Sequence, residues 1–417
     1  MHDSIRLAQG MWFDEKDIEI SFPDDWRVEV CDSPADTMEP MSKAAMEKAF
    51  AEPIGASRIQ ELAKGKQDVV IIFDDISRGT RLYELVPFVL KELKVAGVTD
   101  DRIRFICSLG NHGAHTRVDF VKKLGKAVVA KYPVFNHNPY ENCDNLGKTS
   151  RNTEVSVNSE IMKCDLKIGM GSIVPHPFNG FGGGGKILFP GVSSAETVLG
   201  NHLLSATDLF GKGLNPVDGL GRFDGNIMRL EMEEVCAMAG LDLVVDALVN
   251  SRCETIDLFV GHPIEAHYAG VEIAKKLNGT RLIPNADVAV VNANFKACEA
   301  AIALLFGSKS LKPKGDIVVV SHTPMGQITH YLIGSFGKYI GGKLWSPDRT
   351  SMTDDIGNII IYSPYPSRAD EDWFGGYGRV SWADNWEAVM DLLENNNGSG
   401  THVNVFTDAT IQYFPDE

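Results

Sequence analysis

The sequence predicts an α/β fold made of two α/β domains with mostly parallel sheets and an active-site cleft between them. Three observations carry this prediction: short aliphatic runs of strand length, helical patterns between those runs, and polar residues directly after the runs. Strands that alternate with helices favour parallel sheets, and ligands of such sheets bind beyond the carboxyl ends of the strands. The polar residues are therefore expected to gather at one edge.

The first domain contains three expected strands. Residues 69–73 read "VVIIF" and end at Asp74 and Asp75, and residues 103–109 end before "GNH", which contains His112. Residues 165–170 run straight into a glycine-rich stretch, and residues 82–96 have the apolar spacing of a helix.

The second domain begins near residue 285. Strands are expected at 286–293 and 315–322, with a helix at 296–306, and the tail 401–414 has a strand-like composition. We predict an N-terminal domain over residues 1–280, which carries the motifs, and a C-terminal domain over 281–399, which contributes substrate contacts. The tail 400–417 is free in this scheme to return to the N-terminal domain.

Composition narrows the class of partner and the compartment. The chain has 40 basic and 56 acidic residues, a net charge of −16, which disfavours a nucleic-acid partner. No secretory signal is visible at the N-terminus, and no apolar run approaches the ~20 residues of a membrane span. The seven cysteines are scattered without a C-x-x-C pair, so we expect a cytoplasmic protein without a membrane partner. Oligomerisation is left open.

Residues 171–191, "GSIVPHPFNGFGGGGKILFPG", nearly satisfy the phosphate-binding pattern G-x-x-x-x-G-K-[ST]. Ile187 stands where that pattern needs a Mg²⁺-binding hydroxyl, and Pro190 argues against the long helix that follows such a loop. The apolar flanks favour an ordered loop over a flexible surface loop. Its glycines (Gly182, Gly183, Gly184 and Gly185) allow the backbone to approach a ligand, with Lys186 as an anchor.

A helix is expected after the glycine loop, because residues 193–196 ("SSAE") fit a capping box. This helix carries His202, so one short segment presents His176, Lys186 and His202.

These motifs resemble those of the nickel-dependent lactate racemase family. "PHPFNGFGGGGKILFPGVSSAETVLGNH" is similar to the family's P-H-x-F-x-G-F-S/G-G-G-x-K, P-G, S-x-E-T and N-H segments. "DDISRGTR" at 74–81 resembles its D-x-T-R segment, with Ser77 in place of threonine, and "LGNH" at 109–112 resembles its L-G-T-H segment. The three motifs keep the family's order.

The resemblance implies a nickel-pincer nucleotide, pyridinium-3-thioamide-5-thiocarboxylic acid mononucleotide, held covalently on a lysine. By carry-over, the attachment residue is Lys186, the nickel ligand is His202, and the paired acid/base residues are His112 and His176. The resemblance also assigns cofactor contacts to Asp75, Ser77 and the four glycines, and substrate contacts to Arg78 and, through a looser match, Lys296. Proteins that build the cofactor are the implied partners.

This chemistry is consistent with the residue types. The Cα–H beside a carboxylate is very weakly acidic, so moving a hydride to a cofactor through a 2-keto acid is easier than abstracting a proton. Each face of the substrate then needs a base for its hydroxyl, and histidine titrates near neutrality. Each of three assignments has an alternative nearby in the sequence: His115 could take the role of His112, Arg81 that of Arg78, and Asp74 that of Asp75. The remaining histidines, His330 among them, are expected to be structural or exposed.

We therefore expect an isomerase that racemises or epimerises a 2-hydroxy acid. The alternatives are a non-catalytic protein that binds nickel or a nucleotide-like ligand on the same fold, and a phosphate-loop enzyme. The identity of the acid is open between lactate, malate, aryl and sugar acids. Residues 322–345 are expected to supply a pocket wall through Gln327, His330, Tyr331, Phe336, Tyr339 and Trp345.

Overall fold

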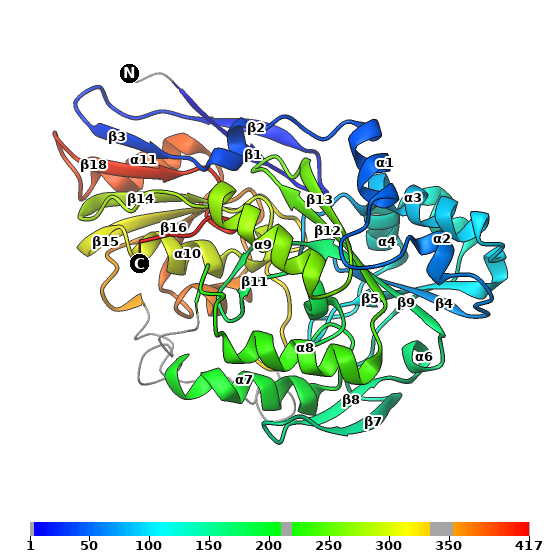
Figure 1. The fold of residues 1–417 in the computed structure, drawn as a ribbon. Coiled ribbons are helices and arrows are strands. Elements are labelled where there is room, and N and C mark those ends of the chain that lie inside the picture. Colours follow the sequence, from blue (N-terminus) through cyan, green and yellow to red (C-terminus); the bar gives the residue numbers. More distant parts are fainter. Residues whose placement is uncertain (1–3, 210–218, 334–352, 417) are drawn as a thin grey trace.

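The aliphatic runs form two six-stranded sheets in a computed structural model that describes residues 4–209, 219–333 and 353–416. Figure 1 shows the first sheet on the right and the second on the left, with both chain ends beside the second sheet. Within the described residues, no helix combines the length and apolar character needed to cross a membrane.

The first sheet has the order β13-β12-β9-β4-β5-β6, and all its neighbours are parallel except β12 and β13. Its strands are β4 (Val69–Asp74), β5 (Ile103–Ser108), β6 (Val134–Asn136), β9 (Leu166–Ser172), β12 (Leu243–Val249) and β13 (Thr255–Gly261). The predicted strands 69–73, 103–109 and 165–170 are thus observed, each within two residues of its expected ends.

The second sheet has the order β17-β16-β15-β14-β18-β3 and is parallel throughout. Its strands are β3 (Arg27–Cys31), β14 (Ala286–Asn292), β15 (Leu311–Val320), β16 (Ile359–Tyr362), β17 (Val380–Ala383) and β18 (His402–Phe406). Three antiparallel pairs complete the described strands: β1 (Ile5–Gln9) with β2 (Lys16–Ile20), β7 (Cys143–Lys148) with β8 (Glu154–Asn158), and β10 (Pro175–His176) with β11 (Gly180–Phe181).

Helices cover the sheets in the usual manner of parallel α/β folds. The described α-helices are α1 (Lys43–Ala51), α2 (Ile59–Leu62), α3 (Leu82–Val95), α4 (Arg117–Leu124), α5 (Lys126–Lys131), α6 (Ser159–Met162), α7 (Ala195–Leu209), α8 (Ile227–Ala239), α9 (Glu265–Leu277), α10 (Ala301–Ser308) and α11 (Trp386–Glu394). Helix α9 packs on β12 and β13, α10 on β14 and β15, and α11 on β16 and β17.

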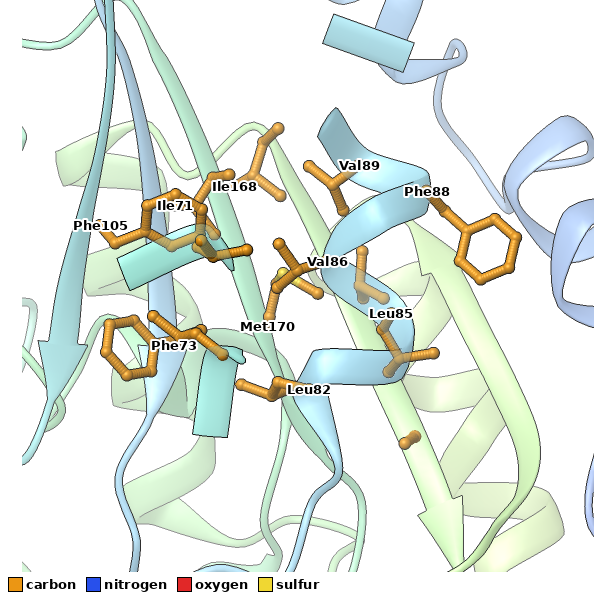
Figure 2. Packing of buried hydrophobic residues seen from close by; sticks show 14 of the residues in the cluster. Ile71, Phe73, Leu82, Leu85, Val86, Phe88, Val89, Phe105, Ile168 and Met170 are labelled. Atoms are coloured by element: carbon orange, nitrogen blue, oxygen red, sulfur yellow. The ribbon is translucent and has the colours of Figure 1, made fainter. Parts of the chain in front are cut away.

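One of the two hydrophobic cores of the first sheet lies between α3 and the sheet, and the other lies on the opposite face. Figure 2 shows apolar side chains of α3 packed against those of β4, β5 and β9. Leu82, Val86 and Val89 of this helix are fully buried, as are Ile71 and Met170 on the strands. The three helix residues, Leu82, Val86 and Val89, have the sequence spacing of one helix face, which is why the helix 82–96 could be predicted.

Strands near both ends of the chain belong to the second sheet, and the last residues pack against the first domain. Strand β18 pairs with β14 and β3, so the tail enters the second sheet, and the N-terminal strand β3 joins the same sheet. After β18 the chain returns to the first domain, where the Tyr413 ring lies 5.7 Å from that of Phe181 and Ile411 joins the core. The division at residue 280 stays a prediction. Strand β3 and the residues after β18 are the segments that cross it.

Two predicted helix boundaries differ in detail. Residues 296–306 form a 3₁₀ turn, η4 (Ala297–Glu299), followed by α10, and not one continuous helix. The cap of α7 lies one residue later than the predicted box, because Ser194 Oγ accepts the Thr197 amide at 3.2 Å while Ser193 Oγ donates to the Leu188 carbonyl.

Candidate active site

A cavity of about 270 Å³ lies where the carboxyl ends of β4, β5 and β9 meet the segment that follows β14. Six of the predicted functional side chains line it: Asp75, Arg78, His112, His176, Lys186 and His202. They come from the ends of three neighbouring parallel strands, from the glycine loop and from α7. The predicted gathering of polar residues at one sheet edge is therefore observed.

Asp75 and His112 form the first charged pair of the cavity. Asp75 follows β4 and His112 follows β5, and His112 Nδ1 lies 2.6 Å from Asp75 Oδ2. Ser77 donates both its backbone N–H, at 3.0 Å, and its hydroxyl to Asp75 Oδ1. These contacts fix the carboxylate and leave the Nε2 atom of His112 directed away from it.

The proton on His112 is strongly held. Burial alone would lower its pKa, but the carboxylates of Asp75 and Glu299 outweigh burial and raise the pKa to about 9. His112 therefore carries a positive charge at neutral pH. His115 Nε2 lies 3.4 Å from the same carboxylate, but His115 does not line the cavity, so the geometry favours His112 for a ligand contact.

Arg78 and Glu299 form the second charged pair. An ion pair joins Arg78 Nη1 to Glu299 Oε2, and Glu299 Oε1 lies 3.5 Å from His112 Nε2. Burial would raise the pKa of Glu299, but Arg78 and His112 hold it well below its ordinary range. The competing residue Arg81 pairs with Glu15 at 2.8 Å and does not line the cavity.

His176 and His202 lie on a less polar side of the same cavity. The ring centroid of Phe178 is 5.7 Å from that of His176 and 5.5 Å from that of His202. Burial lowers the pKa of His202 to about 4, and burial together with the nearby Lys186 lowers that of His176 well below its ordinary value. Both rings are therefore neutral at neutral pH.

The glycine loop is held by one side chain behind it, His267, and by one in the cavity wall, Asp246. His267 Nε2 lies 2.8 Å from the Gly182 carbonyl, which accepts from it, and Asp246 Oδ2 accepts the Gly184 amide at 2.7 Å. A Cβ atom on Gly184 would lie 2.6 Å from the His267 ring, and one on Gly185 would lie 2.4 Å from Cys236 Sγ. These two glycines are required by the packing behind the loop, whereas Gly182 and Gly183 line the cavity.

Lys186 lies in the short 3₁₀ turn η3 (Gly184–Ile187), which does not continue into a long helix; α7 begins only at Ala195. Pro190 lies between the turn and α7, which agrees with the expectation against a phosphate-loop helix. Burial lowers the pKa of Lys186 to about 7, and the charge of Arg78 adds to that effect. A substantial share of the side chain is then the neutral amine, the form that attacks an acyl group.

Lys296 lies beside the cavity but does not line it. Its Nζ atom donates to the carbonyls of Pro175 and Thr410, both at 2.9 Å, and the residue is fully buried. It thereby ties the strand that carries His176 to the C-terminal tail. Substrate contact by Lys296 stays a prediction, and it requires Nζ to leave both carbonyls.

The donor set of the cavity fits a nickel-pincer nucleotide. The Val198 carbonyl lies 2.9 Å from His202 Nδ1, which donates to it, so the Nε2 lone pair is left for a metal. Among the described residues, no cluster of three His, Cys, Asp or Glu side chains is spaced to hold a metal ion, so further ligands must come from a bound group. The buried Asn179 Oδ1, also in the cavity wall, has no hydrogen-bond partner in the described part of the chain and can accept from such a group.

Several cavity residues were not predicted from the sequence. Glu299, Asp246 and Trp373 line the cavity, and so does His330, whose ring centroid lies 5.2 Å from that of His112. The expectation that His330 is structural or exposed is thus corrected, while its expected place in a pocket wall is observed. An acidic residue in a helix-like segment, as Glu299 is, gives no local signal of such a position.

The expected pocket wall at 322–345 is only partly described. Gln327 accepts the Ala300 amide and donates to the Ala297 carbonyl, at 2.8 and 2.9 Å, and does not line the cavity. Phe336, Tyr339 and Trp345 lie outside the described residues.

Comparison with known proteins agrees with the motifs. Residues 13–209 match the family described as the lactate racemase N-terminal domain. The lactate racemase of Thermoanaerobacterium thermosaccharolyticum is 25% identical over 287 residues, which are 67% of this chain and 66% of the relative. That of Lactiplantibacillus plantarum is 28% identical over 248 residues, 59% of this chain and 56% of the relative. The matches thus span less than two thirds of either curated relative.

Solved structures share the fold. The lactate racemase apoprotein from Thermoanaerobacterium thermosaccharolyticum superposes with a TM-score of 0.76 at 20% identity, over 99% of this chain and 100% of that one. A Thermotoga maritima protein gives a TM-score of 0.64 at 14% identity, over 90% and 98%. The predicted resemblance to the lactate racemase family and the predicted α/β fold are both confirmed.

Proposed function

Because residues 13–209 match the lactate racemase N-terminal domain family, we propose that this chain is an isomerase that inverts C2 of a 2-hydroxy acid. The observation that carries the proposal is the convergence of two histidines of opposite protonation state on one cavity. His112 is held charged by Asp75, and His176 is kept neutral by burial. A reaction that must take a hydroxyl proton on either face requires one group that can accept and one that can donate.

The cofactor we propose is the nickel-pincer nucleotide joined to Lys186, with His202 Nε2 as a nickel ligand. When bound, this group accepts the substrate's C2 hydride and returns it, and no protein side chain can do that. Lys186 supplies a partly neutral amine for the link, and Gly182 and Gly183 let the backbone approach the group. The proteins that build the cofactor would be partners of the chain.

The chain's own residues would bind the acid and move its hydroxyl proton. The Arg78 guanidinium suits a carboxylate, because it presents parallel N–H donors in a fixed plane. His112 Nε2 and a ring nitrogen of His176 would serve the hydroxyl from opposite sides. After a 2-keto acid forms, the histidine on the second face returns a proton to the new hydroxyl, which completes the inversion.

The proposal is tested by producing the chain together with the cofactor-building proteins. Three results are expected: added mass on the peptide that contains Lys186, stoichiometric nickel, and inversion of a 2-hydroxy acid followed by chiral chromatography. A chain with modified Lys186 and bound nickel that inverts none of a broad panel of 2-hydroxy acids would contradict it. That outcome would instead support a non-catalytic binding protein.

We also propose that the protein works in the cytoplasm. All seven cysteines are free thiols, and six of them are buried. A reducing compartment keeps such thiols unpaired.

A further inference from the structure

Glu299 is a carboxylate in a site that we propose binds a carboxylic acid. Four other acidic side chains line the cavity. Asp74 pairs with Lys123, Asp75 with His112, and Asp246 with the Gly184 amide; the fourth is Asp372. Glu299 instead stands between Arg78 and His112. These are the two residues proposed to hold the substrate's carboxylate and its hydroxyl.

Glu299 does not occupy the whole of the Arg78 guanidinium. Every hydrogen bond from this guanidinium to the described residues leaves from Nη1, which contacts the Ser77 carbonyl, Ser77 Oγ and Glu299. Nη2 is therefore available to the substrate's carboxylate while the ion pair persists. An acid held by Arg78 Nη2 and His112 Nε2 would therefore lie beside the Glu299 carboxylate, which pairs with Arg78 and lies 3.5 Å from His112 Nε2.

The charge of Glu299 limits what that substituent can be. An ionised carboxylate has acceptors only, so it stabilises a hydrogen-bond donor and repels a second carboxylate. A methyl group leaves the buried carboxylate without the hydrogen bond that water would have given it. An ammonium group would lie beside Arg78 and the charged His112, which repel it. A hydroxyl group meets all three conditions.

We propose that Glu299 selects a 2-hydroxy acid with a further hydroxyl on C3, the pattern of polyhydroxy acids, over lactate-like and dicarboxylic acids. This inference rests on the proposed function and specifies its substrate class. Glu299 acts as a specificity-determining residue: it accepts the C3 hydroxyl proton in a hydrogen bond, and no bond to Glu299 forms or breaks during the reaction.

The test compares three acids that differ only at C3: glycerate with a hydroxyl, lactate with hydrogen, and malate with a carboxylate. For the loaded enzyme we expect kcat/KM for glycerate to exceed that for lactate by roughly tenfold to a hundredfold, the range for a hydrogen bond to a charged group. Malate should be the poorest of the three. In Glu299→Gln the malate-to-glycerate ratio should rise by at least about tenfold, because the repulsion is gone.

Glu52→Gln is the matched control, because Glu52 is exposed and its side chain pairs with Lys48 at 3.8 Å; it should keep the wild-type ratios. Calorimetric titration of the three acids into the unloaded chain gives a second readout, with the same order expected. A wild type that prefers lactate or malate, or a Glu299→Gln variant with unchanged ratios, would overturn the selection by Glu299. Loaded enzyme that inverts no 2-hydroxy acid would instead overturn the proposed function, and the inference with it.

Discussion

The two sides of the cavity give histidine opposite properties. On the side formed by the ends of β4 and β5, His112 contacts Asp75 and approaches Glu299, and its pKa rises to about 9. On the side of the glycine loop and α7, His176 and His202 lie around Phe178 without a carboxylate contact, and burial lowers their pKa values.

This difference shows that burial alone does not decide the charge of a cavity residue. All three histidines are partly or fully buried, and only the one with carboxylate partners keeps its proton. A neutral imidazole can bind a metal or accept a proton, whereas a charged imidazole can only donate. The proposed roles therefore follow from the neighbours of each ring.

The largest expected effect on activity comes from replacing Lys186, whose amine lies on the glycine-loop side of the cavity. Lys186→Arg keeps a cation but cannot form the proposed link, so inversion should fall to the uncatalysed rate, a loss on the order of a millionfold or more. Peptide mass and chiral chromatography check this together. Lys163→Arg, at an exposed lysine, should behave as wild type. Retained inversion in Lys186→Arg would refute the attachment.

Replacing one histidine on each side tests the comparison directly. His112→Gln and His176→Gln should each lower the inversion rate by roughly 10²–10⁴, the usual contribution of a general acid or base. His112→Gln should still oxidise one enantiomer to the 2-keto acid, because the neutral His176 can accept its hydroxyl proton, whereas His176→Gln is left with the charged His112 and should form far less keto acid at neutral pH. A carbonyl reagent in single-turnover experiments detects the keto acid.

Both variants should keep the Lys186 modification and the nickel, because neither ring is the proposed metal ligand. Variants that keep nickel and the full inversion rate would show that the two histidines have no catalytic role.

A smaller effect is expected from replacing Asp75, the carboxylate that keeps His112 protonated. Asp75→Asn removes its main carboxylate partner, so the pKa of His112 should fall and the alkaline limb of the pH–rate profile should move to lower pH. The rate should drop on the order of tenfold to a hundredfold, as for partners that orient metal-ligating histidines. Ser77→Ala, which removes only a hydroxyl contact to Asp75, should shift the profile less. An unmoved alkaline limb in Asp75→Asn would contradict the assigned cause.

The smallest effect is on stability. The pKa of His112 is about 9 in the folded chain against an ordinary value of 6.5, so its contribution is complete below pH 6.5 and is lost as pH rises to about 9. The free energy of unfolding of wild type relative to His112→Gln should therefore decrease by about 3 kcal/mol across this window. Urea denaturation at several pH values measures it, and His262→Gln, at a partly exposed ring, is the control. If the difference in the free energy of unfolding between wild type and His112→Gln stays constant with pH, the pKa of His112 is not raised in the folded chain.

Much of the fold could be predicted, because buried parallel strands leave a clear record in the sequence. The run at 69–73 is apolar at every position and is fully buried in β4. The candidate site residues directly after such runs, Asp75 and His112, could be placed together for the same reason, since parallel strands end at a common edge. The glycine loop was predictable from its motif.

Contacts between the domains could not be predicted. Glu299 reaches Arg78 across 221 positions of sequence, and nothing local distinguishes it from an exposed acid on a helix. Lys296, three residues earlier, was expected to face the substrate, but its side chain turns to the carbonyls of Pro175 and Thr410. The place of the C-terminal tail could not be predicted either, because its strand-like pattern fits either sheet. Only the pairing of β18 with β14 in the structure assigns it to the second sheet.

The fate of the C2 hydrogen is the most direct test that this cavity inverts a 2-hydroxy acid by moving a hydride. The loaded enzyme is given a single enantiomer of a substrate deuterated at C2, in ordinary water, and the opposite enantiomer is analysed by mass spectrometry. We predict that the inverted product keeps its deuterium, because the hydride leaves and returns without exchanging with solvent. Inverted product that has lost its deuterium to water would contradict the proposed mechanism and would indicate proton abstraction from C2.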